Sequence, residues 1–101
     1  MILVVIHLKV HSEKHLELSQ TMALLSSSIR LEKGCQRCDF CQNVEKENEF
    51  CLLEEWDTQE DLKIHLRSER FKIFRGAMNL LKEPYKMTFH TASHLSGIEK
   101  V

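Results

Sequence analysis

Apolar and polar residues alternate with a period of two in four segments of the chain, and this alternation predicts β-strands. The predicted strands cover residues 2–10, 35–44, 49–56 and 85–91. The first strand has apolar residues on both faces, so we expect both faces to be at least partly buried. The second and third strands flank the polar run 45–48, which is typical of the loop of a β-hairpin.

Two further segments have apolar residues at the spacing of an α-helix. The first runs from about residue 12 to residue 33, and Gly34 stands where a C-terminal cap is expected. The second runs from about residue 59 to residue 82, with Thr58 as its N-cap and a break expected at residues 68–70. The apolar stripes of the two helices consist of Leu18, Met22, Leu25 and Ile29, and of Phe71, Phe74, Met78 and Leu81.

The order of these elements, β-α-β-β-α-β, is that of the ferredoxin-like α+β fold, an antiparallel sheet with both helices on one face. The other face of the sheet would leave apolar residues in water, so we expect two sheets to pair in a homodimer. The length of 101 residues predicts a single domain, 1–101. Its polar C-terminal tail, 92–101, either is free or lies across the partner subunit and brings His94 near the other pocket.

The charge of the chain is nearly balanced, with 14 Lys and Arg against 15 Asp and Glu and no long run of one sign. This balance argues against a nucleic-acid-binding protein. The apolar start of the chain, residues 1–10, is interrupted by His7 and Lys9, lacks a basic leader and is too short to cross a bilayer. We therefore expect a cytoplasmic protein that does not bind membranes.

Four cysteines, at positions 35, 38, 41 and 51, resemble the ligands of a metal cluster in their spacing. Residues three apart in a strand lie on opposite faces and about 10 Å from each other, so we expect no metal site. Cys41 and Cys51 are placed to face each other across the hairpin, but a cytoplasmic compartment would keep them as thiols. The cysteines are expected to act as small buried hydrophobic residues.

The most reactive combination of side chains lies between residues 50 and 71. Glu54 and Trp56 project from one face of the third strand, near its end. In the following helix, His65 lies on the apolar side together with Leu62 and Leu66. A carboxylate, an indole and an imidazole are therefore expected to share a pocket, although such a Trp or His alone is more often a structural residue.

Two motifs resemble those of a known family. The second strand begins with Glu-x-Gly-Cys, and the later run has the pattern E-x-W-x(4–6)-L-x-x-H-L-x-S-x-x-F. Together they resemble the antibiotic biosynthesis monooxygenase (ABM) domain family of dimeric α/β barrels, and the similarity covers nearly the whole chain. The matching residues are Glu32, Gly34, Cys35, Glu54, Trp56, Leu62, His65, Leu66, Ser68 and Phe71.

The resemblance implies a small oxygenase, without metal, flavin or other cofactor, that oxidises a phenol, a quinol or a polycyclic aromatic compound with O2. Since the substrate supplies the electrons, the protein needs a dry pocket, a base and donors that steady the anion. His65 is then the candidate base, Trp56 stacks on the substrate, and Glu54 orients the imidazole or holds a hydroxyl group. The predicted substrate pocket also contains His7, Cys38, Phe71, Phe74 and Met78.

Some positions depart from the family pattern. Residues 68–71 read Ser-Glu-Arg-Phe where many relatives have Ser-Pro-His-Phe, so a second imidazole is missing, and Cys38 replaces an aromatic residue. Haem-degrading enzymes of this fold use an Asn and a His where this chain has His7 and Arg75, so we do not expect haem degradation. The alternatives are a non-catalytic dimer that binds a small ligand, and an isomerase or hydrolase that uses the same base.

Overall fold

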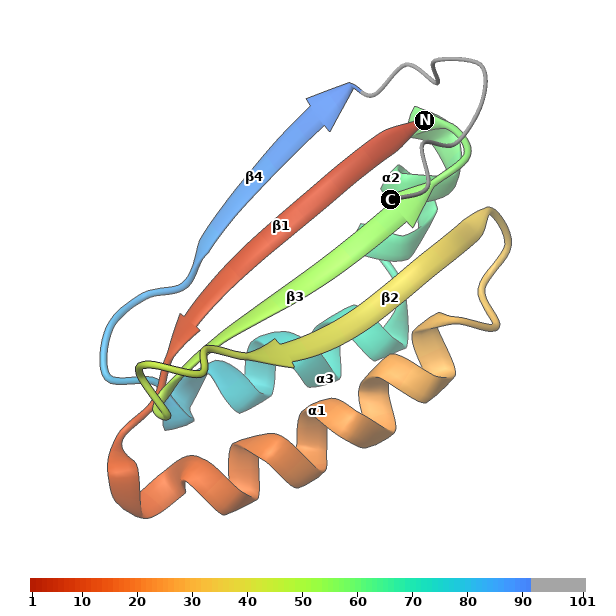
Figure 1. Cartoon of the computed structure of the whole chain (residues 1–101). Coiled ribbons are helices and arrows are strands. Elements are labelled where there is room, and N and C mark those ends of the chain that lie inside the picture. The colour runs from red at the N-terminus through yellow and green to blue at the C-terminus, as the bar shows by residue number, and fades with distance from the viewer. Residues whose placement is uncertain (92–101) are drawn as a thin grey trace.

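The sheet is antiparallel, has the strand order β2-β3-β1-β4 and carries all of the helices on one face (Figure 1). The computed structural model describes residues 1–91, so the predicted tail 92–101 and His94 lie outside the described residues. The ferredoxin-like α+β fold is confirmed. The elements are β1 (Ile2–Lys9), η1 (Ser12–Lys14), α1 (His15–Ile29), β2 (Cys35–Gln42), β3 (Glu49–Trp56), α2 (Gln59–Leu66), α3 (Glu69–Ala77), η2 (Met78–Leu80) and β4 (Lys86–Thr91).

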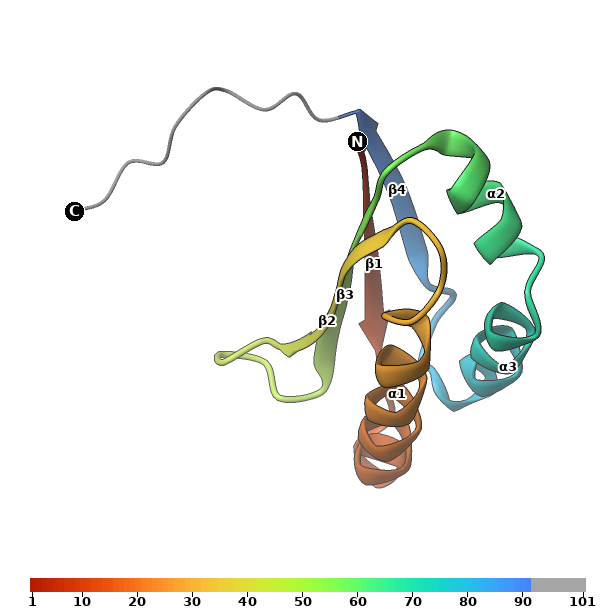
Figure 2. The ribbon, with the colours of Figure 1, turned by 90° about the vertical axis from the view of Figure 1, so that its right-hand side faces the viewer.

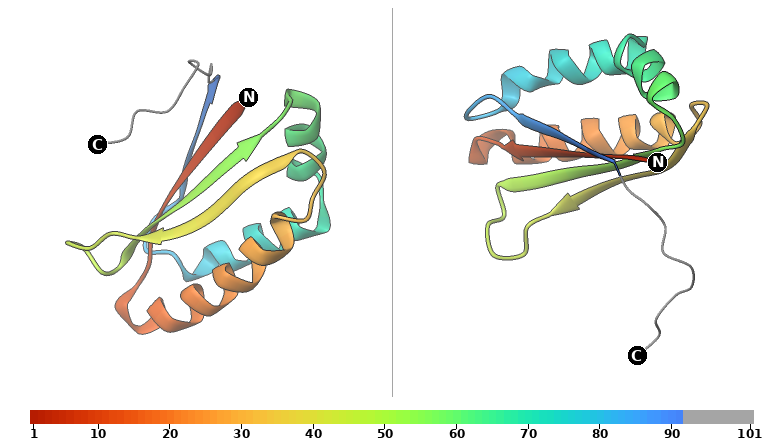
Figure 3. Two further views of the ribbon diagram at one scale, coloured as in Figure 1. Left: turned by 45° about the vertical axis from the view of Figure 1, so that its right-hand side comes forward. Right: turned by 90° about the horizontal axis from the view of Figure 1, so that it is seen from above.

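The two faces of the sheet have different surroundings. Seen along its edge, the sheet has α1, α2 and α3 on one side and none of these helices on the other (Figures 2 and 3). Alternate residues of β1 and β3 point toward the helices and are buried, whereas their neighbours on the open face are half-buried or exposed. The core on the helix-covered face includes Val4, Ile6, Leu8, Leu18, Met22, Ile29, Phe50, Leu52, Trp56, Phe71 and Phe74.

The second helical region is divided in two, as its sequence predicts. α2 begins after Thr58, whose Oγ1 accepts a hydrogen bond from the Asp61 amide at 3.1 Å. Ser68 is the N-cap of α3, because its Oγ accepts a hydrogen bond from the Phe71 amide at 3.2 Å. The first helix is shorter than predicted at both ends. Residues 12–14 form a 3₁₀ turn and α1 begins only at His15; it ends at Ile29 with Arg30 as its C-cap, so the expectation of a cap at Gly34 was wrong.

A β-bulge at the start of β2 changes which cysteines share a face. The register shifts between Cys35 and Arg37, so Cys35 pairs with Trp56 and Cys38 pairs with Glu54. Both cysteines therefore lie on the helix-covered face, and the expectation that residues three apart lie on opposite faces was wrong for this pair. Cys41 lies on the open face and pairs with Cys51, as predicted.

Candidate active site

Glu54, Trp56 and His65 lie in contact where the end of β3 meets α2. Their exposed fractions are only 1%, 0% and 1%. Trp56 Nε1 donates a hydrogen bond of 2.8 Å to Glu54 Oε1. The imidazole stacks on the indole with 4.5 Å between ring centroids and 27° between planes. The period-two strand and the 3.6-residue helix thus bring these three side chains together, as their positions in the sequence indicate.

A fourth side chain, Glu32, completes this cluster from the turn after α1. Both of its carboxylate oxygens lie 3.0–3.1 Å from His65 Nδ1. On the other side of the ring, His65 Nε2 lies 3.4 Å from Glu54 Oε1. The imidazole therefore stands between two carboxylates. Sequence reasoning named Glu32 only as part of a motif, because no local spacing rule connects residues 33 positions apart.

The surroundings of His65 change its affinity for a proton. Burial alone lowers the pKa of His65, but the contact with Glu54 and the negative charges of Glu54 and Glu32 outweigh burial. The pKa of His65 is consequently raised above its ordinary value of 6.5. The imidazole is thus a stronger base than an isolated histidine, and its protonated form is stabilised by two neighbours.

Two polar atoms of this cluster are buried without a hydrogen-bond partner in the described part of the chain. They are His65 Nε2 and Glu54 Oε2. A buried polar group without a partner costs about 1–3 kcal/mol, so such atoms are uncommon in a core that serves packing alone. The imidazole nitrogen either donates or accepts a hydrogen bond, and the carboxylate oxygen accepts one. A hydroxyl group is therefore a suitable partner for both.

Of the other predicted pocket residues, Cys38, Phe71, Phe74 and Met78 pack into the core on the helix-covered face, whereas His7 does not. Phe71 meets the His65 ring edge-on, with centroids 5.4 Å apart, and stacks on Phe74 at 5.2 Å. Cys38 lies opposite Glu54 in the sheet, and burial, followed by the Glu54 charge, raises the pKa of its thiol to about 12. Met78 is half-buried and packs against the core at the start of η2.

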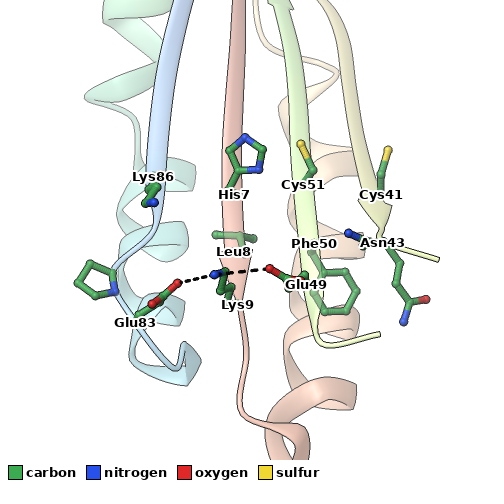
Figure 4. Close-up of a pocket in the computed structure, with 12 residues that line it drawn as sticks. His7, Leu8, Lys9, Cys41, Asn43, Glu49, Phe50, Cys51, Glu83 and Lys86 are labelled. Carbon is green, nitrogen blue, oxygen red and sulfur yellow. Dashed lines mark ion pairs between the residues drawn. The ribbon is translucent and has the colours of Figure 1, made fainter. Parts of the chain in front are cut away.

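His7 lies on the open face, so the structure separates it from His65 by the sheet itself. Neighbouring residues of a strand point to opposite faces, and Ile6 and Leu8 occupy the helix-covered side. The expectation that His7 shares a pocket with Phe71 and Phe74 was therefore wrong. His7 lines a different pocket of about 550 Å³, which also contains Cys41 and Cys51 (Figure 4).

A small apolar pocket lies beside the buried cluster, between α2 and the adjacent ends of β1 and β4. It has a volume of about 250 Å³. Leu62 and Leu66, which flank His65 on α2, form part of its wall, and Ile2, the register partner of Trp56, forms another part. His65, Trp56 and Glu54 do not line this pocket.

Neither a metal cluster nor a membrane span is found among the described residues. Residues 1–91 contain no group of three or more His, Cys, Asp or Glu side chains placed to hold a metal ion. The same residues include no helix with the length and apolar character needed to cross a membrane.

Comparisons with known proteins agree on one family. Residues 1–77 match the family described as "Antibiotic biosynthesis monooxygenase". The chain is 35% identical over 75 residues to "Putative monooxygenase YcnE" of Bacillus subtilis (strain 168), a match that covers 73% of this chain and 78% of that protein.

Solved structures of this fold agree closely with the chain. A conserved protein from Methanosarcina mazei Go1 superposes with a TM-score of 0.86 at 28% identity, over 91% of this chain and 92% of that one. A structure described as a "putative antibiotic biosynthesis monooxygenase" from Deinococcus radiodurans gives a TM-score of 0.89 at 20% identity, over 99% and 100% of the two chains.

Proposed function

This chain belongs to the antibiotic biosynthesis monooxygenase family, and we propose that it oxidises a quinol, a phenol or a polycyclic aromatic molecule with O2 without a cofactor. The observation that carries this proposal is the buried imidazole of His65, stacked on Trp56 and held between the carboxylates of Glu32 and Glu54. Ionisation of a phenol requires a base that accepts the hydroxyl proton, and a flat aromatic side chain beside that base is able to stack on the phenol ring.

The proposed reaction begins with proton transfer. Neutral His65 accepts the proton of a substrate hydroxyl group at Nε2, the ring nitrogen without a hydrogen-bond partner. Glu32 and Glu54 then stabilise the imidazolium, and Trp56 stacks on the substrate anion. The anion is electron-rich enough to pass an electron to O2. In the net reaction the substrate loses two hydrogen atoms and gains one oxygen atom, while the second oxygen atom leaves as water.

We propose that the substrate enters from the small pocket beside α2. Only Asp61, Leu62 and His65 of α2 are buried, so few buried side chains move when the helix shifts outward. Leu62 and Leu66 line this pocket and flank His65 in the sequence of α2. Closure of α2 over the substrate then excludes water from the reacting anion.

We also propose that the protein acts as a homodimer that pairs the open faces of two sheets. Leu3, Val5 and Leu53 lie side by side on the open face and are only half-buried in one protomer. Packing of two such faces would remove their apolar surface from water.

Oxygen uptake by the chelator-treated protein, with a panel of hydroquinones and polyphenols, tests the proposed activity. Enzyme-dependent uptake should be lost in His65→Ala and greatly reduced in Trp56→Phe, with both variants shown to be folded by circular dichroism. His11→Ala, an exposed histidine distant in sequence from the cluster, is the matched control and should retain full activity. Uptake equal to the uncatalysed rate across the panel, with ligands that still bind, would identify a non-catalytic binding protein. Turnover without oxygen consumption would identify an isomerase.

A further inference from the structure

His7, Cys51 and Cys41 form a row across three neighbouring strands on the open face of the sheet. His7 of β1 pairs with Cys51 of β3, and Cys51 pairs with Cys41 of β2. In Figure 4 the three side chains stand on the same side of the sheet and line one pocket. Both cysteines are free thiols. This row takes no part in the proposed oxidation, because the sheet separates it from His65.

The distance between the two thiols depends on whether Cys41 and Cys51 form a hydrogen-bonded or a non-hydrogen-bonded pair in the antiparallel ladder. The Asn43 amide donates to the Glu49 carbonyl at 2.9 Å, so these residues form a hydrogen-bonded pair. Two residues further along each strand, Cys41 and Cys51 are again a hydrogen-bonded pair, with Cα atoms and Cβ atoms each about 5.5 Å apart. A relaxed disulfide needs Cβ atoms about 3.5–4.5 Å apart. The two thiols are therefore better spaced for an atom that bridges them than for a direct bond.

A bridging metal ion fits this spacing. Two metal–sulfur bonds of about 2.3 Å in a line hold the sulfur atoms about 4.6 Å apart. Two ligands are too few for zinc, which takes four, and the described residues contain no group of three or more metal ligands. A soft monovalent cation such as Cu(I) prefers thiolates and is satisfied by two of them.

The charges at the pair also favour a cation. Two thiolates on adjacent strands repel each other, and a cation between them offsets that repulsion. Binding of a cation displaces both thiol protons, transfers no electron and leaves one net negative charge.

We propose that Cys41 and Cys51 form a two-thiolate binding site for a soft monovalent cation of the Cu(I) class on the open face of the sheet; because the proposed dimer pairs the same face, the site is available in the unpaired protomer. The site lies beside the hairpin end of the sheet, where Asn43 and Pro84 complete the wall of the pocket (Figure 4). The proposal is independent of the oxygenase activity, since the chelator-treated protein in the uptake assay lacks the cation.

A competition titration with Cu(I) tests this site. The reduced full-length protein is titrated without oxygen against a chromophoric Cu(I) chelator, and the wild type should withdraw about one Cu(I) per chain. Cys41→Ser and Cys51→Ser should each bind at least about 100-fold more weakly, because each loses the second tethered ligand. Cys35→Ser is the matched control, since Cys35 lies in the same strand as Cys41 but on the other face, and it should bind like the wild type.

Three results would overturn the proposal. They are failure of the wild type to withdraw Cu(I), full affinity in both single serine variants, and an equal loss in the Cys35 control. Circular dichroism of each variant separates loss of the site from loss of the fold. Quantitative formation of a Cys41–Cys51 disulfide in mild oxidised glutathione would contradict the spacing on which the bridging argument rests.

Discussion

The same strands form both faces of the sheet, but ionisable groups are buried on one face and remain in contact with solvent on the other. On the helix-covered face, His65, Glu54 and Trp56 are fully buried, and the pKa of His65 is raised by its carboxylate neighbours. On the open face, Lys9 contacts Glu49 and Glu83 at 3.6 and 3.1 Å, and all three side chains remain in contact with solvent (Figure 4). Similar pairs of charges thus differ in effect, because burial decides how strongly they interact.

Removal of the indole should have the largest effect on stability. Trp56→Ala leaves a cavity in the helix-covered face and frees Glu54 Oε1, so the free energy of unfolding should fall by about 3–5 kcal/mol. Ile73→Ala, at a site that is 56% exposed, is the control and should change stability little. Urea unfolding monitored by circular dichroism measures both. Equal losses in the two variants would mean that the cluster around Trp56 is not a packed core.

The turn that carries Glu32 toward the buried face should be the next most sensitive region. Gly34 has φ = 82°, and an added Cβ would collide with the Asp61 side chain of α2. Gly34→Ala should therefore destabilise the protein by about 1–3 kcal/mol. Gly76→Ala in α3 is the matched control, because nothing lies within 4 Å of its added Cβ. It should stabilise the protein by about 0.4–1 kcal/mol in the same unfolding experiment. Destabilisation by both substitutions to the same extent would contradict this account of Gly34.

The buried imidazole should make the stability of the protein depend on pH near neutrality. Because the pKa of His65 is higher in the folded state, its stabilising contribution is complete below the unfolded-state pKa of about 6.5 and is lost as pH rises through the folded-state pKa. The difference in unfolding free energy between wild type and His65→Gln should fall from about pH 6.5 upward, by at most about 1.4 kcal/mol per pH unit. A difference that grows with pH would contradict the raised pKa.

A substitution on the open face should lower the free energy of unfolding by a smaller amount, and this loss should depend on protein concentration. Leu53→Ala removes a half-buried side chain, so the loss in a dilute sample should be about 1 kcal/mol. The loss should increase with concentration if the open faces pair, because dimerisation stabilises the wild type by mass action. Sedimentation velocity on both proteins provides the oligomeric state. A loss that does not change with concentration would contradict pairing through this face.

Local patterns in the sequence were sufficient to predict the elements of the fold and one side of the candidate site. The third strand, Glu49–Trp56, and the Thr58 cap follow from alternation and capping chemistry, which involve only residues close in the chain. The inward direction of His65 follows from its spacing with Leu62 and Leu66. These features are local and therefore readable without a structure.

The remainder of the site depends on contacts between distant parts of the chain. Glu32 reaches His65 only because the turn after α1 lies against α2, and the bulge that turns Cys35 toward the core is set by pairing with β3. The burial of the imidazole results from packing of several elements. No pattern within a single segment carries this information, so sequence reasoning placed His7 in the wrong pocket.

Titration of the His65 ring by NMR tests the central claim most directly, because it observes the proton that Glu32 and Glu54 are said to hold. In the wild type the pKa of His65 should lie above 6.5, and in Glu32→Gln it should fall because one of the two stabilising charges is lost. Glu83→Gln, which alters a carboxylate of the open face, should leave the His65 titration unchanged. A wild-type pKa below 6.5, or one that Glu32→Gln does not lower, would contradict the account.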